Sequence, residues 1–362
     1  MAESETIPPD LRIRARGACS NAAGRYEKSQ TRFDADGWAQ EVGDNLLCTH
    51  VTTEVARRII TYNRSPDLPF DRSVNPYRGC EHGCIYCFAR PTHAWLGMSP
   101  GLDFETRLIA RPNASTLLDK ELRHPRYVPR PIAIGTNTDP YQPIEQEQAI
   151  TRACLEVLRR FSHPVAIVTK GTLIERDLDI LADMAGQGLV RVGISVTSLD
   201  ADLARRLEPR APSPKRRLAT IRALSDAGVP VRLMTSPIIP GLTDHEIEAL
   251  LAAGQEAGAD AASWIMLRLP LEVAPLFQEW LQAHYPDRVN RVMNRVREMH
   301  GGKDYEAEWG RRMRGTGVYA RLIARRFEAA AARLGLSGDQ PGLRLDLFER
   351  PFEKGAQMSL FG

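Results

Sequence analysis

Three cysteines that could hold a metal centre stand within eight residues of one another. Cys80, Cys84 and Cys87 occur in the segment CEHGCIYC. Thiolate sulfur is the ligand that iron–sulfur clusters and other soft metals prefer. Three thiolates on a four-iron cluster leave one iron ion without a protein ligand, and that iron can bind a small molecule through an amine and a carboxylate. The spacing therefore predicts a [4Fe-4S] cluster with one open position.

A zinc site is the alternative that this spacing leaves open. Zinc prefers four tetrahedral sulfur and nitrogen ligands, so His82 or His93 would have to complete the set. His82 lies inside the ligand loop itself. Structural zinc sites more often pair two CxxC-like segments than use one CxxxCxxC segment. The pattern therefore favours the iron–sulfur cluster.

The composition is that of a globular protein. The 362 residues are 43% hydrophobic and 26% charged, and the formal net charge is +3. A charge this small leaves nucleic-acid binding open without requiring it. No apolar run approaches the roughly 18 residues of a membrane span, and the first residues lack the basic and apolar regions of a signal peptide. We therefore expect a cytoplasmic protein.

The elements that must position the cysteines are short apolar runs that alternate with amphipathic helical stretches. Strands are predicted at 131–137, 165–170, 190–196, 231–238 and 262–269, and a helical stretch follows each of them. With a strand before the cysteines, these make six βα units. Parallel barrels place their sites on the loops after the strands. The predicted fold class is α/β: a partial (β/α)6 barrel with an irregular N-terminal arm and a C-terminal helical cap.

The same pattern divides the chain into four parts. They are a basic N-terminal arm and linker (1–65), the partial barrel (66–286), a helical cap (287–336) and a flexible tail (337–362). The arm shows neither helical nor strand periodicity. The arm and the cap helices are rich in arginine, which would suit phosphate contact, although solvated helix faces explain these residues equally well.

The cysteine segment resembles the signature of the radical S-adenosylmethionine (SAM) superfamily, in which an aromatic residue, here Tyr86, precedes the third cysteine. The resemblance extends over roughly residues 70–275. The segments GTNTDPYQPIE, VTKGTLIERD, LEPRAPSP and SPIIPGLTD resemble the branch that includes spore photoproduct lyase, a DNA repair enzyme. The whole chain resembles an uncharacterised bacterial group of that branch.

The resemblance implies two cofactors, a [4Fe-4S] cluster and SAM, together with an external one-electron donor. The cluster would cleave SAM reductively to a 5′-deoxyadenosyl radical, which abstracts hydrogen from a substrate. It also implies roles for residues near the strand ends. Tyr86 would pack against adenine, Thr138 and Asp139 would bind the methionyl amine, Lys170 the carboxylate and Ser195 the ribose or carboxylate, and Arg210 would pair with Glu208 near the cofactor.

One departure from this branch concerns the return of hydrogen to the product. Spore photoproduct lyase uses a cysteine located after the cluster, and the matching stretch GTNTDPYQP contains none. The one later cysteine, Cys154, shares a helical face with apolar residues and is expected in the core. Reversal of spore photoproduct is therefore doubtful, and Tyr141 is the candidate for a catalytic hydrogen relay.

The last residues carry a second signal. The sequence QMSLF, formed by Gln357, Met358, Ser359, Leu360 and Phe361, resembles the short motif by which bacterial DNA repair and replication proteins bind the sliding clamp. The segment RLDLF (344–348) is a poorer copy of it. The alternative is that both apolar clusters fold back onto the barrel.

These observations lead to one main hypothesis and two alternatives. The main hypothesis is a radical SAM enzyme that acts on DNA, with lyase-like or other hydrogen-abstracting chemistry in repair, and that the sliding clamp recruits. The first alternative is radical SAM modification of RNA or of a protein. The second is a clamp-binding scaffold whose cluster is only structural.

Overall fold

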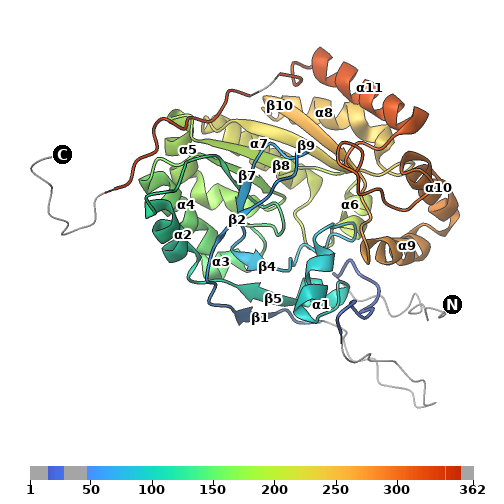
Figure 1. Cartoon of the computed structure of the whole chain (residues 1–362). Coiled ribbons are helices and arrows are strands. Elements are labelled where there is room, and N and C mark those ends of the chain that lie inside the picture. Colours follow the sequence, from blue (N-terminus) through green and yellow to red (C-terminus); the bar gives the residue numbers. More distant parts are fainter. Residues whose placement is uncertain (1–14, 28–46, 339, 352–362) are drawn as a thin grey trace, which may run out of the picture.

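The computed structural model describes residues 15–27, 47–338 and 340–351. Its centre is a seven-stranded sheet with the strand order β10-β9-β8-β7-β6-β3-β2 (Figure 1). The strands are β2 (Ile60–Tyr62), β3 (Arg72–Val74), β6 (Ile132–Ile134), β7 (Val165–Thr169), β8 (Val190–Ser195), β9 (Val231–Ile238) and β10 (Ala261–Met266). All neighbours pair in parallel except β2 and β3. The six parallel strands confirm the predicted partial barrel.

The register of the sheet aligns β-branched residues into a row that helps to form the core. The row consists of Ile134, Ile167, Val192 and Val231, paired in succession across β6 to β9. Each of these residues is at most 1% exposed. Because valine and isoleucine suit a pleated, buried surface, the row fixes both the register and the side on which the helices pack.

The helices lie along the outer side of the sheet (Figure 1). They are α2 (Ala114–Arg123), α3 (Glu145–Gln148), α4 (Ile150–Arg160), α5 (Leu178–Gly186), α6 (Ala201–Leu207), α7 (Pro214–Asp226), α8 (Ile247–Glu256) and α9 (Val273–His284). The helical stretch predicted after the second barrel strand is divided, because Ala149 has a φ of 49° and separates α3 from α4. The short helix α6, which Asp200 caps through the amides of Asp202 and Leu203, was not predicted.

The C-terminal helices extend this outer layer. They are α10 (Val289–Met299) and α11 (Gly317–Arg333). The helix α11 packs against α8, and its Phe327 ring lies 5.9 Å from that of Trp264 on β10. The loop between the two helices runs beside β10, where the Met266 amide donates to the carbonyl of Met313 at 2.9 Å.

A second, three-stranded sheet lies below the main one in Figure 1 and was not predicted. Its strands are β1 (His50–Thr53), β5 (Arg107–Ala110) and β4 (Tyr77–Arg78), and α1 (Leu102–Thr106) precedes β5. The part of the predicted arm at residues 15–27 has no helix or strand but packs against α1. There Arg16 is 8% exposed and donates to the carbonyl of Glu105 at 2.9 Å, so this arginine of the arm is buried against α1.

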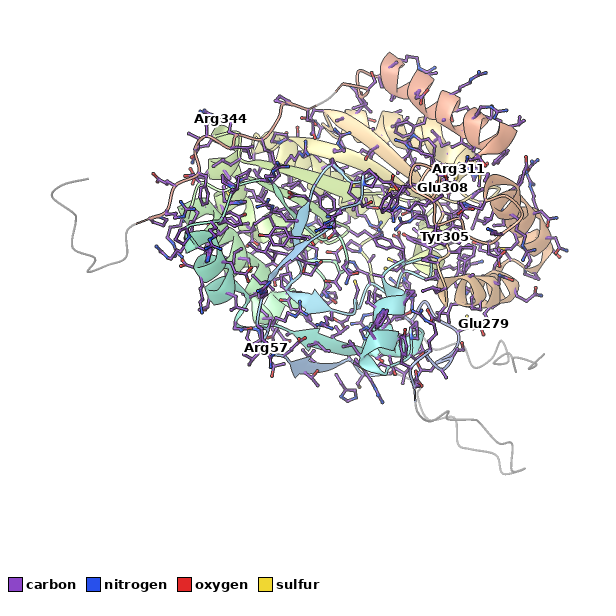
Figure 2. The ribbon with its side chains drawn as sticks, viewed as in Figure 1. Arg57, Glu279, Tyr305, Glu308, Arg311 and Arg344 are labelled. Carbon is purple, nitrogen blue, oxygen red and sulfur yellow. The ribbon has the colours of Figure 1, made fainter. Side chains whose placement is uncertain are left out.

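The described part of the C-terminal tail forms an extended strap across α5, α4 and α2. The Arg344 amide donates to the carbonyl of Gly188, and the Glu349 amide donates to that of Phe161. Arg344, at the start of this strap, is labelled in Figure 2. The Phe348 ring lies 5.5 Å from His163, edge-on. The segment RLDLF therefore folds back onto the barrel, as the alternative reading predicted, whereas 357–361 lie outside the described residues.

Replacing Phe348 by alanine should loosen the strap. The ring is half-buried among Tyr127, Phe161 and His163. We expect Phe348→Ala to lower the free energy of unfolding by about 1–3 kcal/mol, less than for a fully buried ring, as measured by urea denaturation. The control is Leu345→Ala, because Leu345 is 42% exposed and should cost less than about 0.5 kcal/mol. Equal effects of the two changes would contradict the assignment.

No helix in the described ranges has the length and apolar character that crossing a membrane requires.

Candidate active site

A cavity of about 200 Å³ opens where the parallel strands end. It is lined by the cysteine loop and by residues at the ends of β6, β7, β8, β9 and β10. These are Cys80, His82, Cys84, Tyr86, Cys87, Phe88, Gly135–Asp139, Val168–Lys170, Ser195, Met234, Ser236, Pro237, Ile265, Met266 and Arg268. A larger hollow beside Asn63 and Arg130 contains none of the cysteines. The cavity at the strand ends is therefore the site that the sequence predicts.

The three predicted ligands come together in this cavity. Cys80 and Cys84 are 7% and 9% exposed, and Cys87 is half-buried. Burial raises the pKa of Cys84 to about 12 and that of Cys80 well above its usual value. Such thiols become thiolates only when a bound cation stabilises the negative charge. The loop is thus suited to hold a metal centre and poorly suited to hold free thiolates.

A buried ion pair holds the backbone of the cysteine loop. The guanidinium of Arg90 donates to the carbonyl of Cys84 at 3.0 Å and to that of Gly83 at 3.1 Å, and it pairs with Glu105 at 2.5 Å. Arg90 and Glu105 are both 0% exposed. Glu105 also accepts from the amides of Gly17 and Ala18 at 2.9 and 2.8 Å. One carboxylate therefore links the N-terminal segment to the loop that carries the cysteines.

The turn of the loop depends on Gly83. Its φ is +66°, in the left-handed region, and a β-carbon built there would lie 2.7 Å from Oε2 of Glu105. A side chain at this position would be strained and would also collide with the ion pair that holds the loop.

The histidines proposed for a zinc site are otherwise engaged. His82 Nδ1 lies 3.3 Å from a carboxylate oxygen of Asp139, and His93 Nε2 lies 2.9 Å from the carbonyl of Arg107, away from the cavity. Among the residues that the structure describes, no three Cys, His, Asp or Glu side chains are arranged to ligate one metal ion. In a four-iron cluster each thiolate binds a different iron ion, so convergence on one point is not required.

Asp139 stabilises the loops at the ends of β6 and β7. Its carboxylate accepts from the Thr169 hydroxyl at 2.5 Å, the Lys170 amide at 2.8 Å and the Tyr141 amide at 2.9 Å. Burial opposes ionisation of Asp139, but His82 and these donors lower its pKa to about 2. Asp139 is thus a charged anchor in the cavity wall, and its oxygens are already hydrogen-bonded.

Tyr86 is held by a buried network beneath the cavity. Its hydroxyl bonds Glu208 and lies 3.1 Å from the hydroxyl of Thr197. Glu208, 1% exposed, also pairs with Arg217, which donates to the carbonyl of Ser195 at 3.0 Å. Although burial disfavours its charged form, Arg217 helps to lower the pKa of Glu208 to about 2. The network fixes the tyrosine ring in the cavity wall.

The predicted pair between Glu208 and Arg210 is wrong. Glu208 pairs instead with Arg217, nine residues further along the chain. This is because α7 brings Arg217 back beneath β8. Arg210 is exposed and pairs with Glu81 at 3.0 Å, outside the cavity lining.

Two polar groups in the cavity have no hydrogen-bond acceptor or carboxylate of their own among the described residues. The Ser236 hydroxyl is buried and makes no hydrogen bond. No described carboxylate pairs with the Lys170 ammonium, which lies 5.8 Å from the centre of the Tyr86 ring. A buried polar group without a partner is costly. The cavity is therefore prepared for a ligand that offers an acceptor to both groups.

The remaining predicted residues differ in how close they come to the cavity. Thr138 and Ser195 line it, although their hydroxyls bond the carbonyls of Tyr77 and Ser236, each at 3.1 Å. Tyr141 does not line it. Its ring is 2% exposed and its hydroxyl donates to Asp177 at 3.1 Å, which argues against the proposed hydrogen relay.

Sequence reasoning missed Ser236, Arg268, Arg90 and Arg217. Ser236 and Arg268 lie near the carboxyl ends of the strands predicted at 231–238 and 262–269, so their positions alone could have suggested them. Arg90 and Arg217 are buried through tertiary contacts that no motif in the chain marks.

Comparisons with known proteins agree with this geometry. Residues 74–253 match the family model of the radical SAM superfamily. Uncharacterized proteins of Mycobacterium bovis and Mycobacterium tuberculosis are 40% identical over 274 residues, which cover 75% of this chain and 77% of each relative. An uncharacterized protein of Methanocaldococcus jannaschii is 24% identical over 62% of this chain and 80% of its own length.

Solved structures share the fold. A spore photoproduct lyase complexed with dinucleoside spore photoproduct superimposes with a TM-score of 0.53 at 16% identity, over 78% of this chain and 79% of that one. A mutant of that enzyme with bound AdoMet and dinucleoside spore photoproduct gives a TM-score of 0.50 at 17% identity, over 78% of each chain.

The cavity fits the cofactors of this family, a [4Fe-4S] cluster and SAM. The three cysteines supply the thiolates. The Ser236 hydroxyl supplies a donor that makes no hydrogen bond, and the Lys170 ammonium supplies a positive charge that no described carboxylate pairs with. The chain belongs to the radical SAM superfamily and is an enzyme that uses a [4Fe-4S] cluster and SAM.

Proposed function

We propose that this enzyme cleaves SAM reductively and acts on DNA, in a repair-related reaction. When bound, the cluster supplies the electron that splits SAM into methionine and a 5′-deoxyadenosyl radical, which removes a hydrogen atom from the substrate. The observation that carries the proposal is the cavity that gathers three thiols, one ammonium and one unpaired hydroxyl. The structural likeness to an enzyme that holds a dinucleoside photoproduct supports DNA as the substrate class.

The residues of the chain would bind, orient and shield. Lys170 would neutralise the carboxylate of SAM, and Ser236 would donate a hydrogen bond to it. The face of the Tyr86 ring, fixed through Glu208, would support the adenine. Apolar side chains such as Ile265 and Met266 would exclude water from the site where the hydrogen is removed.

The proposed reaction differs from that of spore photoproduct lyase in the way the product recovers hydrogen. Among the described residues that line the cavity, the cysteines are Cys80, Cys84 and Cys87, which we assign to the cluster. Cys154, on α4, is 0% exposed and packs in the core. We therefore propose a DNA substrate whose conversion needs no thiol from this cavity.

The experiment that tests the proposal follows a label from substrate to cofactor. Reduced, anaerobically reconstituted enzyme is incubated with SAM and deuterated DNA, intact or irradiated, and the 5′-deoxyadenosine is analysed by mass spectrometry. Deuterium in that product is the expected result. Label taken only from deuterated RNA or protein would overturn the choice of DNA. Formation of no 5′-deoxyadenosine would overturn the reaction itself.

Replacing Lys170 by glutamine should weaken SAM binding and leave the cluster in place. Loss of one charge-assisted contact in a partly dry site costs roughly 1.5–3 kcal/mol, or a tenfold to hundredfold rise in Kd. Equilibrium binding of SAM to unreduced enzyme measures it, and iron content is the internal check. The matched control is Lys215→Gln, an exposed lysine on α7. Equal SAM affinities in the two variants would contradict the role of Lys170.

The C-terminal residues support a proposed partner, the bacterial sliding clamp. The strap ends at Pro351, whose carbonyl accepts from Arg123 on α2 at 2.6 Å, so the motif at 357–361 follows a fixed attachment point. Deleting residues 357–362 should abolish clamp binding and leave iron content and SAM cleavage intact. Unchanged clamp binding after the deletion would contradict this partner.

A further inference from the structure

An arginine without a carboxylate partner lies at the mouth of the cavity. Arg268 follows β10 by two residues and lines the cavity together with Phe88 of the cysteine loop. Its guanidinium carbon lies 4.4 Å from the centre of the Phe88 ring. No described residue forms an ion pair or a hydrogen bond with this guanidinium. Arg268 is thus a cation held in place by stacking alone.

The surroundings of Arg268 add to the need for an anion. Burial lowers the pKa of Arg268, and the neighbouring Arg312 lowers it further. The nearby carboxylate, Asp67, is already paired with Arg312 at 2.7 Å and accepts from the Gly310 amide at 2.8 Å. A half-buried guanidinium in this position is destabilised until an anion reaches it.

SAM does not account for this second cation. It carries one carboxylate, and Lys170 at the end of β7 is the cation placed deeper, beside Tyr86. Arg268 follows β10, which is three positions away from β7 in the sheet, and this corresponds to roughly 14 Å between the two strands. We therefore assign the carboxylate of SAM to Lys170 and look to the substrate for an anion that reaches Arg268.

Phe88 indicates what accompanies that anion. The residue is 46% exposed although it directly follows a buried loop, and its ring lies in the cavity wall. An exposed aromatic ring beside an arginine is a surface on which nucleic-acid bases stack. Phosphate oxygens are the anions that the planar guanidinium binds in bidentate fashion.

We propose that Arg268 and Phe88 form a nucleotide subsite for the substrate, in which Arg268 binds a phosphate and Phe88 stacks on the adjoining base. The subsite rests on the proposed function and deepens it, because it names the part of a nucleic acid that is held beside the cofactor. It lies next to Cys87, so a base on Phe88 would be close to the reacting centre.

The test compares thymidine 5′-monophosphate with thymidine as ligands of cluster-loaded, SAM-bound, unreduced enzyme, by titration calorimetry or ligand-observed NMR. Arg268→Gln should weaken binding of the monophosphate at least about tenfold and leave binding of thymidine unchanged. Phe88→Leu should weaken both ligands about fivefold or more. The affinity for SAM is measured in each variant, since a fall caused by Arg268→Gln would reassign this arginine to the cofactor and overturn the subsite.

The matched control is Arg311→Gln. Arg311 lies in the loop between α10 and α11, is labelled beside Glu308 in Figure 2, and forms an exposed pair with that residue at 2.8 Å. This variant should bind the monophosphate as the unaltered enzyme does. A loss equal to that of Arg268→Gln would show that general positive charge, and not the subsite, attracts the ligand.

The remaining outcomes separate the subsite from the proposed function. If the monophosphate binds through Arg268 but no deuterium leaves DNA, the DNA reaction fails and the subsite stands. If the unaltered enzyme does not bind the monophosphate at about 10 mM, or if Arg268→Gln binds it equally well, the subsite is overturned whatever the reaction proves to be.

Discussion

Replacing Cys84 by alanine should abolish both cluster binding and SAM cleavage. Two thiolates cannot hold a four-iron cluster with one open position, so anaerobically reconstituted Cys84→Ala should contain well below the expected four or so iron ions per chain. Its visible absorption should be lost and its formation of 5′-deoxyadenosine should fall to background. Iron and sulfide assays together with product analysis measure these effects.

The control for this change is another buried cysteine. Cys154, on α4, is 0% exposed and packs in the core, outside the cavity lining. Cys154→Ala should therefore keep full iron content and SAM cleavage. Retention of both properties by Cys84→Ala would remove the cysteine loop from the mechanism.

Replacing Arg90 by glutamine should have the next largest effect. Its guanidinium bonds four backbone carbonyls, those of Gly83, Cys84, Pro100 and Gly101, in addition to the carboxylate of Glu105. Removing one member of a fully buried pair leaves an uncompensated charge, which costs about 3–5 kcal/mol of the free energy of unfolding. Thermal or urea denaturation of the enzyme measures this loss.

A second variant separates the role of Arg90 in the loop from its role in stability. Arg90→Lys keeps the charge but loses the planar fork, so the cluster loop should be held less firmly in a folded protein. We expect faster loss of iron in air and a shifted EPR signal of the reduced cluster. The control is Arg326→Gln, which breaks a partly exposed pair with Glu248 and should cost less than about 1 kcal/mol. Cluster properties unchanged in Arg90→Lys would contradict a positioning role.

The barrel could be predicted from the sequence because its signal is local. The strand β8 reads VRVGIS and β9 reads VRLMTSPI, and the helical stretches that follow have apolar residues at helical spacing. The second sheet could not be predicted in the same way. Its strands are two to four residues long, too short for an alternating pattern of apolar residues to develop. In addition, β1 pairs with β5, which lies more than fifty residues further along the chain.

In the candidate site, too, the residues marked by a local pattern could be predicted, and those placed by long-range contacts could not. The cysteines follow from a local spacing, and Lys170 and Ser195 from their places at strand ends. Pairing between side chains was not predictable, because the fold decides which cation reaches a buried carboxylate. Glu208 illustrates this, since Arg210 is closer in the chain but Arg217 reaches it from α7.

The C-terminal tail shows that the surroundings of a short apolar motif determine whether it packs on the barrel. The segments RLDLF and QMSLF have similar apolar patterns in the sequence. The segment RLDLF packs on the barrel through Phe348, whose ring contacts that of His163 edge-on. Just after it, Arg350 donates to the carbonyl of Tyr127 at 3.0 Å. Contacts of this kind cannot be recognised in the sequence before the segments that supply them are placed in the fold.

The central claim is that three cysteines hold a four-iron cluster whose open iron ion binds SAM. EPR spectroscopy of the dithionite-reduced, anaerobically purified enzyme, recorded with and without SAM, tests it most directly. We expect the signal of a reduced [4Fe-4S] cluster, a change of that signal when SAM is added, and its absence from Cys84→Ala. A colourless protein that contains zinc, or a cluster signal that SAM leaves unchanged, would contradict the account.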